Sequence, residues 1–271
     1  MSTTLPPVVF IVGLWLHSTS WSSWVELFAA AGYETLTPEW PGVPNSIEAA
    51  RKNPEGQAGK GISDIVTHYA SVLKAMDRKP VVIGHSFGGL IAQNLLSQDL
   101  ATAAVAIDPA PIKGVRALPL AQLRSGFPVL RNPANKKKTV ALTVQQFRYA
   151  FGNAIGAEES AALHEEWTIP GPGRPWFEAA FANFSQHSPA AVNTQNATRG
   201  PLLLISGGQD HTVPDVVTRS TFKLYKDSGA STELRQFPDR GHSLTIDSGW
   251  REIADATLEW LAAKSAASAW N

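Results

Sequence analysis

The chain has 271 residues, of which 44% are hydrophobic and 17% charged, and this suits one large domain or one domain with an insertion. Its 23 lysine and arginine residues balance its 23 aspartate and glutamate residues, and a net charge of zero argues against a nucleic-acid-binding surface. Cysteine is absent, which excludes disulfides, thiolate chemistry and cysteine-ligated metals.

The sequence shows no targeting signal. Residues 1–7 have neither the basic region nor the apolar core of a secretion signal. The longest apolar runs have the length of strands and are too short to cross a membrane. We therefore expect a cytoplasmic protein with no nucleic-acid or membrane partner, and the sequence leaves its oligomeric state open.

Strand-like and helix-like segments alternate along the first part of the chain. Runs of β-branched and aromatic residues predict strands at residues 8–12, 34–37, 81–83 and 103–107. Apolar residues at helical spacing, with turn residues beside them, predict helices at residues 21–31, 62–76 and 88–97. Residues 42–60 combine closely spaced prolines and glycines with one short helical pattern, and we expect an irregular loop there.

The alternation lapses over residues 112–199, which are rich in helix formers, aromatic residues and Pro/Gly breakers. We interpret this segment as a helical cap inserted between two strands of the sheet. The alternation then resumes, with strands at residues 202–206 and 232–237 and helices at residues 213–227 and 249–264. The predicted domains are a core of residues 1–111 and 200–271 and a cap of residues 112–199.

This order of elements predicts an α/β fold with a mostly parallel, doubly wound sheet. Such a sheet carries its chemistry in the loops beyond the carboxyl ends of its strands. Each of the motifs described next follows a predicted strand directly.

The first motif is Gly84-His-Ser-Phe-Gly-Gly, which lies between a predicted strand and a predicted helix. A serine on a sharp strand-to-helix turn is a nucleophile elbow. Gly84 and Gly88 leave room for the chain to double back, because neither has a side chain. The turn exposes the hydroxyl of Ser86 and aims the backbone N–H of Phe87 at the same reaction centre.

A serine hydroxyl needs a base, and the base needs an orienting carboxylate. In elbow-type hydrolases the acid and then the histidine follow the serine along the chain. His242 follows the strand at residues 232–237, and Asp210 follows the strand at residues 202–206. We favour His242 as base and Asp210 as acid. The rival acids are Asp108, Asp215 and Asp239, of which Asp239 is too close to His242 along the chain to approach it from a separate loop.

The chain resembles the α/β-hydrolase-fold superfamily over essentially its whole length, in its serine-nucleophile, esterase/lipase-like branch. The motifs that carry the resemblance are Gly84-His-Ser-Phe-Gly-Gly, Ser206-Gly-Gly-Gln-Asp-His-Thr-Val-Pro and Asp239-Arg-Gly-His. The resemblance implies Ser86 as nucleophile, His242 as general base and then acid, and Asp210 as its partner. It also implies an oxyanion hole formed by the backbone N–H groups of Leu14 and Phe87.

The sequence departs from the family pattern in two places. Many members have His-Gly where this chain has Val12-Gly13. The chain also has too little length before its first strand for the antiparallel hairpin of the full fold, so we expect about six strands.

The resemblance implies hydrolysis of a small to medium apolar carboxylic ester or lactone through a Ser86 acyl-enzyme. The alternatives with the same residues are a cofactor-free perhydrolase (haloperoxidase-like) and a C–C bond hydrolase, and a small-molecule binding protein on this fold is a third. Haloalkane dehalogenases and epoxide hydrolases are excluded because they use aspartate at the elbow.

The remaining candidates are less specific. Near the site, Trp15, His17, His85 and His211 are candidate substrate contacts. His68, His164 and His187 lack carboxylate or cysteine partners at ligand spacing. We therefore expect no metal and no cofactor. The run of residues 131–138, with its three consecutive lysines, is interpreted as a solvated turn.

Overall fold

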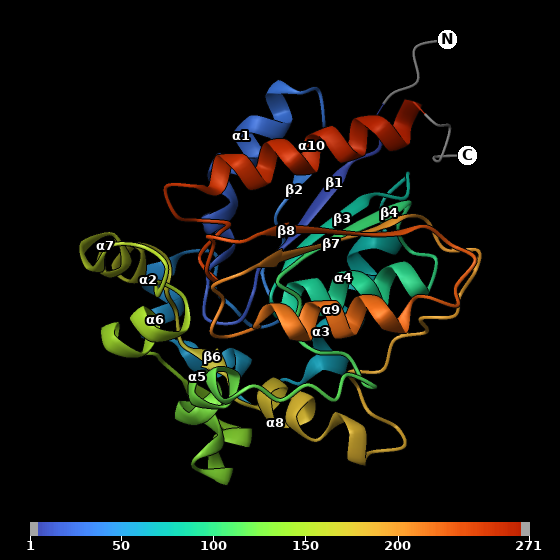
Figure 1. Cartoon of the computed structure of the whole chain (residues 1–271). Helices are drawn as coiled ribbons and strands as arrows, with labels where there is room; N and C mark the ends of the chain where they lie inside the picture. The colour runs from blue at the N-terminus through green and yellow to red at the C-terminus, as the bar shows by residue number, and fades with distance from the viewer. Residues whose placement is uncertain (1–4, 267–271) are drawn as a thin grey trace.

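A computed structural model describes residues 5–266 and has a six-stranded sheet at its centre (Figure 1). The strands lie in the order β2-β1-β3-β4-β7-β8, and every neighbouring pair is parallel. Their bounds are β1 Val8–Ile11, β2 Thr35–Leu36, β3 Val81–His85, β4 Ala103–Ile107, β7 Leu202–Gly207 and β8 Thr232–Phe237. The predicted parallel sheet of about six strands is confirmed.

Helices cover both faces of this sheet. Figure 1 shows α1 and α10 over one face and α3, α4 and α9 over the other. Their bounds are α1 Ser22–Ala30, α3 Ile62–Lys74, α4 Phe87–Ser97, α9 Asp215–Leu224 and α10 Trp250–Ala266. Helix α3 buries Ile62, Ile65, Tyr69 and Leu73, which repeat at helical spacing. None of the helices in residues 5–266 is long and apolar enough to cross a membrane.

An aromatic cluster attaches the first helix to the sheet. The ring of Phe10, on β1, lies 5.0 Å from that of Trp21 and 5.2 Å from that of Phe28. The indole N–H of Trp24 donates to the backbone oxygen of Thr245 at 2.9 Å. This bond ties α1 to the loop that follows β8, which is the loop that carries His242.

Between β4 and β7 the chain leaves the sheet and forms the insertion, by which we mean residues 112–199. Helices dominate it, as predicted, but β5 and β6 also form a short antiparallel pair. It contains the elements α5 Leu120–Leu130, η3 Pro133–Lys137, β5 Thr139–Val140, α6 Val144–Ala150, α7 Ala157–Trp167, β6 Gly171–Pro172, α8 Arg174–Ala180 and η4 Ala182–Phe184. The division into core and cap stays a prediction.

The prediction of an irregular loop over residues 42–60 is wrong in part. The segment contains helix α2 Ile47–Lys52 and the 3₁₀ turn Pro54–Gln57. Ser46 caps α2 by accepting a hydrogen bond from the N–H of Ala49. Side chains of this segment also bond to the insertion, since Gln57 donates to the backbone oxygen of Pro170 at 2.6 Å. The Ser46 cap and these distant contacts together hold a short helix between the prolines and glycines of this segment.

Candidate active site

Ser86 occupies the turn between β3 and α4 with φ 56° and ψ −121°. A positive φ is uncommon for a residue with a side chain, so the surroundings must hold this conformation in place. The N–H of Ser86 donates to Ile107 at the end of β4, at 2.9 Å. Its carbonyl accepts from the N–H groups of Gly89 and Ala110, each at 2.9 Å. The end of the neighbouring strand therefore fixes the turn.

The two glycines of the elbow are required by close approach of the backbone. A Cβ on Gly84 would lie 2.1 Å from the carbonyl oxygen of Gly88. A Cβ on Gly88 would lie 2.2 Å from the carbonyl oxygen of Ile11. Because these neighbours are backbone atoms, they cannot move aside as a flexible side chain could.

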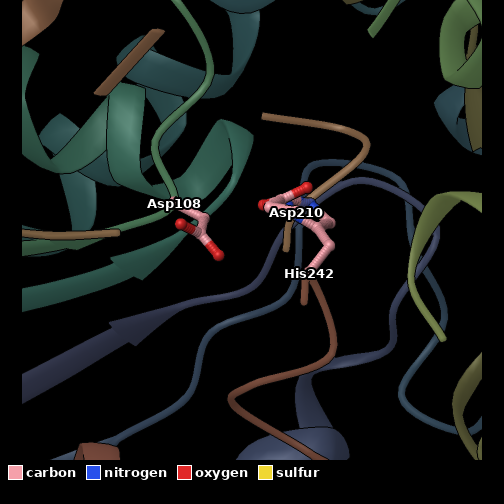
Figure 2. Close-up of side chains that lie close together, drawn as sticks. All are labelled: Asp108, Asp210 and His242. Atoms are coloured by element: carbon pink, nitrogen blue, oxygen red, sulfur yellow. The ribbon is translucent and has the colours of Figure 1, made fainter. Parts of the chain in front are cut away.

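His242 and Asp210 form a buried hydrogen-bonded pair (Figure 2). Nδ1 of His242 lies 2.5 Å from Oδ2 of Asp210. The other carboxylate oxygen accepts from the N–H groups of Thr212 at 2.6 Å and Val213 at 2.8 Å. A proton on Nδ1 donates to the carboxylate and leaves Nε2 free to accept one. Nε2 is buried and has no hydrogen-bond partner, Ser86 included, in residues 5–266.

Asp108 lies beside this pair at the end of β4, with its carboxyl group turned toward Asp210 (Figure 2). Oδ1 accepts from the N–H of Gly207 at 2.7 Å, and Oδ2 is buried. Burial, and then the negative charge of Asp210, raise the pKa of Asp108 well above its ordinary 3.8. Asp108 therefore keeps its proton to a higher pH than an ordinary aspartate, next to the carboxylate of Asp210.

The other two candidate acids lie elsewhere. Asp215 accepts from the hydroxyl of Ser206 at 2.8 Å and pairs with Arg219 at 2.5 Å. Asp239 is exposed to solvent. Only Asp108 and Asp210, of the candidates considered, lie close to His242.

Asp108, Asp210 and His242 are also the one group in the described chain whose ligand atoms are close enough to share a metal ion, within 4.8 Å of one another. The hydrogen bond at 2.5 Å engages two of those atoms with each other. This arrangement suits the transfer and orientation of a proton rather than coordination.

Replacing Asp108 with asparagine should raise stability at neutral pH. Asparagine can accept from the N–H of Gly207, as Asp108 does, and its NH₂ group would face the Asp210 carboxylate. In the wild type, the folded state keeps a proton that the unfolded state loses above about pH 4, so folding stability falls as pH rises through that region. Asp108→Asn removes this loss, so its stability advantage over the wild type should grow between pH 5 and pH 8.

Urea denaturation of both proteins at the two pH values measures this difference. Groups that titrate alike in both proteins cancel in the comparison. An advantage that stays constant, or shrinks as pH rises, would show that Asp108 is not held in its protonated form.

The loop after β1 approaches the elbow closely. A Cβ on Gly13 would lie 2.9 Å from the Cβ of Ser86. The next residue, Leu14, and Phe87 at the start of α4 have backbone N–H groups with no acceptor in residues 5–266. Their positions beside the serine suit the predicted oxyanion hole. At Val12, where many family members have histidine, the backbone carbonyl accepts a hydrogen bond from the indole N–H of Trp40 at 3.0 Å.

Ser86 opens onto a cavity of about 370 Å³ between the sheet and the insertion. On the sheet side its walls are Ser86, Phe87, Thr212 and Val213. The other walls come from residues 110–130 and 176–184 and are mostly apolar. This volume lies near the lower end of the range for small-molecule sites, about 300–1,000 Å³.

None of the four predicted substrate contacts is among the residues that line this cavity. Trp15 is buried, and its indole N–H donates to Val140 at 3.0 Å. His17 is buried and pairs with Glu39 at 2.9 Å. Burial opposes a charge on His17, but the hydrogen bond and the charge of Glu39 outweigh it and raise the pKa of the imidazole. Both side chains hold the first loop in place.

The other two predicted contacts, His85 and His211, lie nearer the hydrogen-bonded pair of His242 and Asp210. The ring of His85 lies 4.6 Å from that of His242. Burial, and then the proximity of His242, keep the pKa of His85 well below 6.5, so its ring is neutral. His211 stacks on Tyr149 with ring centres 4.6 Å apart and bonds to the carbonyl of that residue.

Sequence reasoning missed Thr212 and Val213. Their N–H groups hold the Asp210 carboxylate, and both residues also line the cavity. The available signal is their position two and three residues after an aspartate, where an aspartate side chain commonly accepts backbone hydrogen bonds.

The sequence matches the profile of the alpha/beta hydrolase family over residues 8–256. A search of curated proteins finds no match. Three solved structures with the same fold are a monoacylglycerol lipase from Paleococcus ferrophilus, a methylesterase from Arabidopsis and a protein described as a putative non-heme bromoperoxidase from Mycobacterium tuberculosis.

These three structures are distant in sequence. The lipase is 22% identical, with a TM-score of 0.65 and 95% of each chain covered. The methylesterase is 16% identical, with a TM-score of 0.66 and 95% of this chain and 99% of that chain covered. The third is 20% identical, with a TM-score of 0.70 and 95% and 92% covered. Identities this low establish the fold alone. The family assignment rests on the profile, which matches residues 8–256. The chain therefore belongs to the alpha/beta hydrolase family.

Proposed function

We propose that the chain is a serine hydrolase that cleaves a small to medium apolar carboxylic ester or lactone through an acyl-enzyme on Ser86. The observation that carries the proposal is the hydrogen bond of 2.5 Å between His242 and a carboxylate held by two backbone N–H groups. That bond fixes the imidazole tautomer a general base requires. Ser86, on its strained turn, opens onto the apolar cavity next to it.

In this mechanism Nε2 of His242 takes the proton of the Ser86 hydroxyl as its oxygen attacks the ester carbonyl. The N–H groups of Leu14 and Phe87 stabilise the oxyanion, and each such donor contributes about 10²–10³ in rate. His242 then protonates the departing alcohol, and an acyl-enzyme remains. A water gives a proton to Nε2 of His242 as it attacks the acyl carbonyl. His242 then returns this proton to the Ser86 oxygen as its bond to the acyl carbon breaks, and the carboxylic acid departs.

The attack requires Nε2 of His242 to reach the hydroxyl of Ser86. A hydrogen bond between these groups commonly tightens only when substrate is bound. The cavity favours an apolar substrate because most of its walls are apolar side chains. The insertion supplies most of those walls, which supports a role as a cap over Ser86.

A panel of p-nitrophenyl esters and a fluorophosphonate probe test the proposal. We expect turnover of short- and medium-chain esters, and covalent labelling at Ser86 identified by mass spectrometry of the digested protein. Absence of labelling, with ligands bound but not cleaved, would favour the binding-protein alternative. Labelling at Ser86 without ester turnover would favour C–C bond hydrolysis. Halogenation or peracid formation in the presence of hydrogen peroxide would favour a perhydrolase.

A further inference from the structure

The cavity beside Ser86 has one charged side chain in its wall, and that side chain is Arg116. No aspartate or glutamate lines the cavity within the described chain. Arg116 is exposed to solvent and has no ion-pair or hydrogen-bond partner in residues 5–266. A guanidinium at the wall of an apolar cavity, with its donors unused, is suited to bind an anion.

The backbone before Arg116 is fixed by Asn183, which also lines the cavity. The N–H of Gly114 donates to the side-chain oxygen of Asn183 at 2.7 Å. The side-chain amide of Asn183 donates in turn to the carbonyl of Val115 at 2.6 Å. Gly114 has φ 105°, a conformation that glycine adopts readily. The loop is therefore held in place before a ligand binds, which lowers the entropic cost of binding.

Several apolar side chains of the cavity wall are open to solvent. Leu118, Leu123 and Phe184 line the cavity and are 63%, 39% and 86% exposed. Gln122, also in the wall, is buried, and its side-chain amide makes no hydrogen bond in the described part of the chain. The wall of the cavity thus combines apolar surface with unused polar donors.

The surrounding segment is strongly positive although the whole chain is neutral. Residues 109–157 contain eight lysine and arginine residues and no aspartate or glutamate. Lys136, Lys137 and Lys138 are exposed on the turn that packs against α5. Clustered charge of one sign around a cleft raises the local concentration of ligands of the opposite sign.

We propose that the substrate of this site is an ester whose apolar acyl chain ends in a carboxylate, and that Arg116 is the residue that selects it. The inference rests on the proposed function and specifies its substrate class. The apolar chain lies along the cavity walls, the ester carbonyl reaches Ser86, and the distal carboxylate pairs with Arg116. A half-ester of a dicarboxylic acid has this chemistry.

Kinetics on a matched pair of esters test the selection. Mono-p-nitrophenyl adipate and p-nitrophenyl hexanoate have the same chain length, and only the adipate ends in a carboxylate. We expect the wild-type kcat/KM to be about tenfold higher for the adipate. Arg116→Gln should bring the ratio of the two values close to one, and Arg116→Lys should keep part of it.

Arg131→Gln is the matched control, because Arg131 is exposed at the other end of α5 and does not line the cavity. It should keep the wild-type ratio. A wild-type ratio near one, a ratio unchanged in Arg116→Gln, or an equal loss in the control would overturn the proposal. Hydrolysis of both esters at equal rates would overturn the selection by Arg116 and leave the proposed function intact.

If neither ester is hydrolysed, the result counts against the proposed function. A binding measurement then still tests whether Arg116 selects an anion. Calorimetric titration of the Ser86→Ala protein with hexanoate and with hexanamide compares a charged and a neutral ligand of one shape. Hexanoate should bind more tightly, and adding Arg116→Gln should remove the difference. Equal binding of both ligands, or binding of neither, would contradict the selection of an anion.

Discussion

Replacing Ser86 with alanine should lower kcat for p-nitrophenyl esters by about 10⁶, because no acyl-enzyme can form without the hydroxyl. A residual acceleration of about 10³–10⁴ over water is expected, since the backbone donors and the cavity remain. The substitution removes only the hydroxyl group. The turn at Ser86 is held by backbone hydrogen bonds to Ile107, Gly89 and Ala110. The fold should therefore persist.

Stopped-flow or steady-state release of p-nitrophenol measures the loss, and circular dichroism with thermal unfolding checks the fold. Substrate binding should survive in the variant, so KM or an inhibition constant should change little. Turnover at the wild-type rate in a correctly folded Ser86→Ala protein would exclude Ser86 as the nucleophile.

Replacing Asp210 with asparagine should lower kcat by about 10⁴. The N–H groups of Thr212 and Val213 require an acceptor, so they will bind the amide oxygen and turn the NH₂ group toward His242. Nδ1 must then accept this hydrogen bond, which places the ring proton on Nε2. His242 would present a proton to Ser86 where it needs a lone pair.

Asp108→Asn is the matched control for Asp210→Asn, because both remove one carboxyl group from the same buried cluster. Because Asp210, and not Asp108, accepts the hydrogen bond of His242, we expect a much smaller loss of activity in that variant. Steady-state kinetics on both proteins decide which carboxyl orients His242. A larger loss in Asp108→Asn than in Asp210→Asn would assign that role to Asp108.

Local features of the sequence predicted the sheet and the places of the proposed catalytic residues at the ends of its strands. The elbow around Ser86 needs a strand, two glycines and a helix in immediate succession, and all of these are visible within one short stretch. Asp210 and His242 follow strands whose alternation is equally clear. Parallel strands have their carboxyl ends at one edge, so these residues had to meet there.

The choice between carboxyl groups and the walls of the cavity could not be predicted in this way. Asp108 and Asp210 both follow strands of the sheet, and only their hydrogen bonds and burial distinguish them. Arg116 lies in a loop without a periodic pattern, and Asn183, which fixes that loop, is distant in sequence. Helix α2 was assigned to a loop because prolines and glycines surround its short helical pattern. Such features depend on tertiary packing, which a single sequence does not reveal.

The attachment of the insertion to the first loop has a consequence for protein engineering. The carbonyl of Trp15 accepts from Ile169 at 2.9 Å, and Leu16 forms a bridge with Thr168, so the chain just beyond Leu14 is pinned by residues of the insertion. Exchanging the insertion for that of a relative would therefore change more than substrate specificity. It would also remove the support of Leu14, the proposed oxyanion donor, so chimeric proteins should lose rate and selectivity together unless the graft restores those contacts.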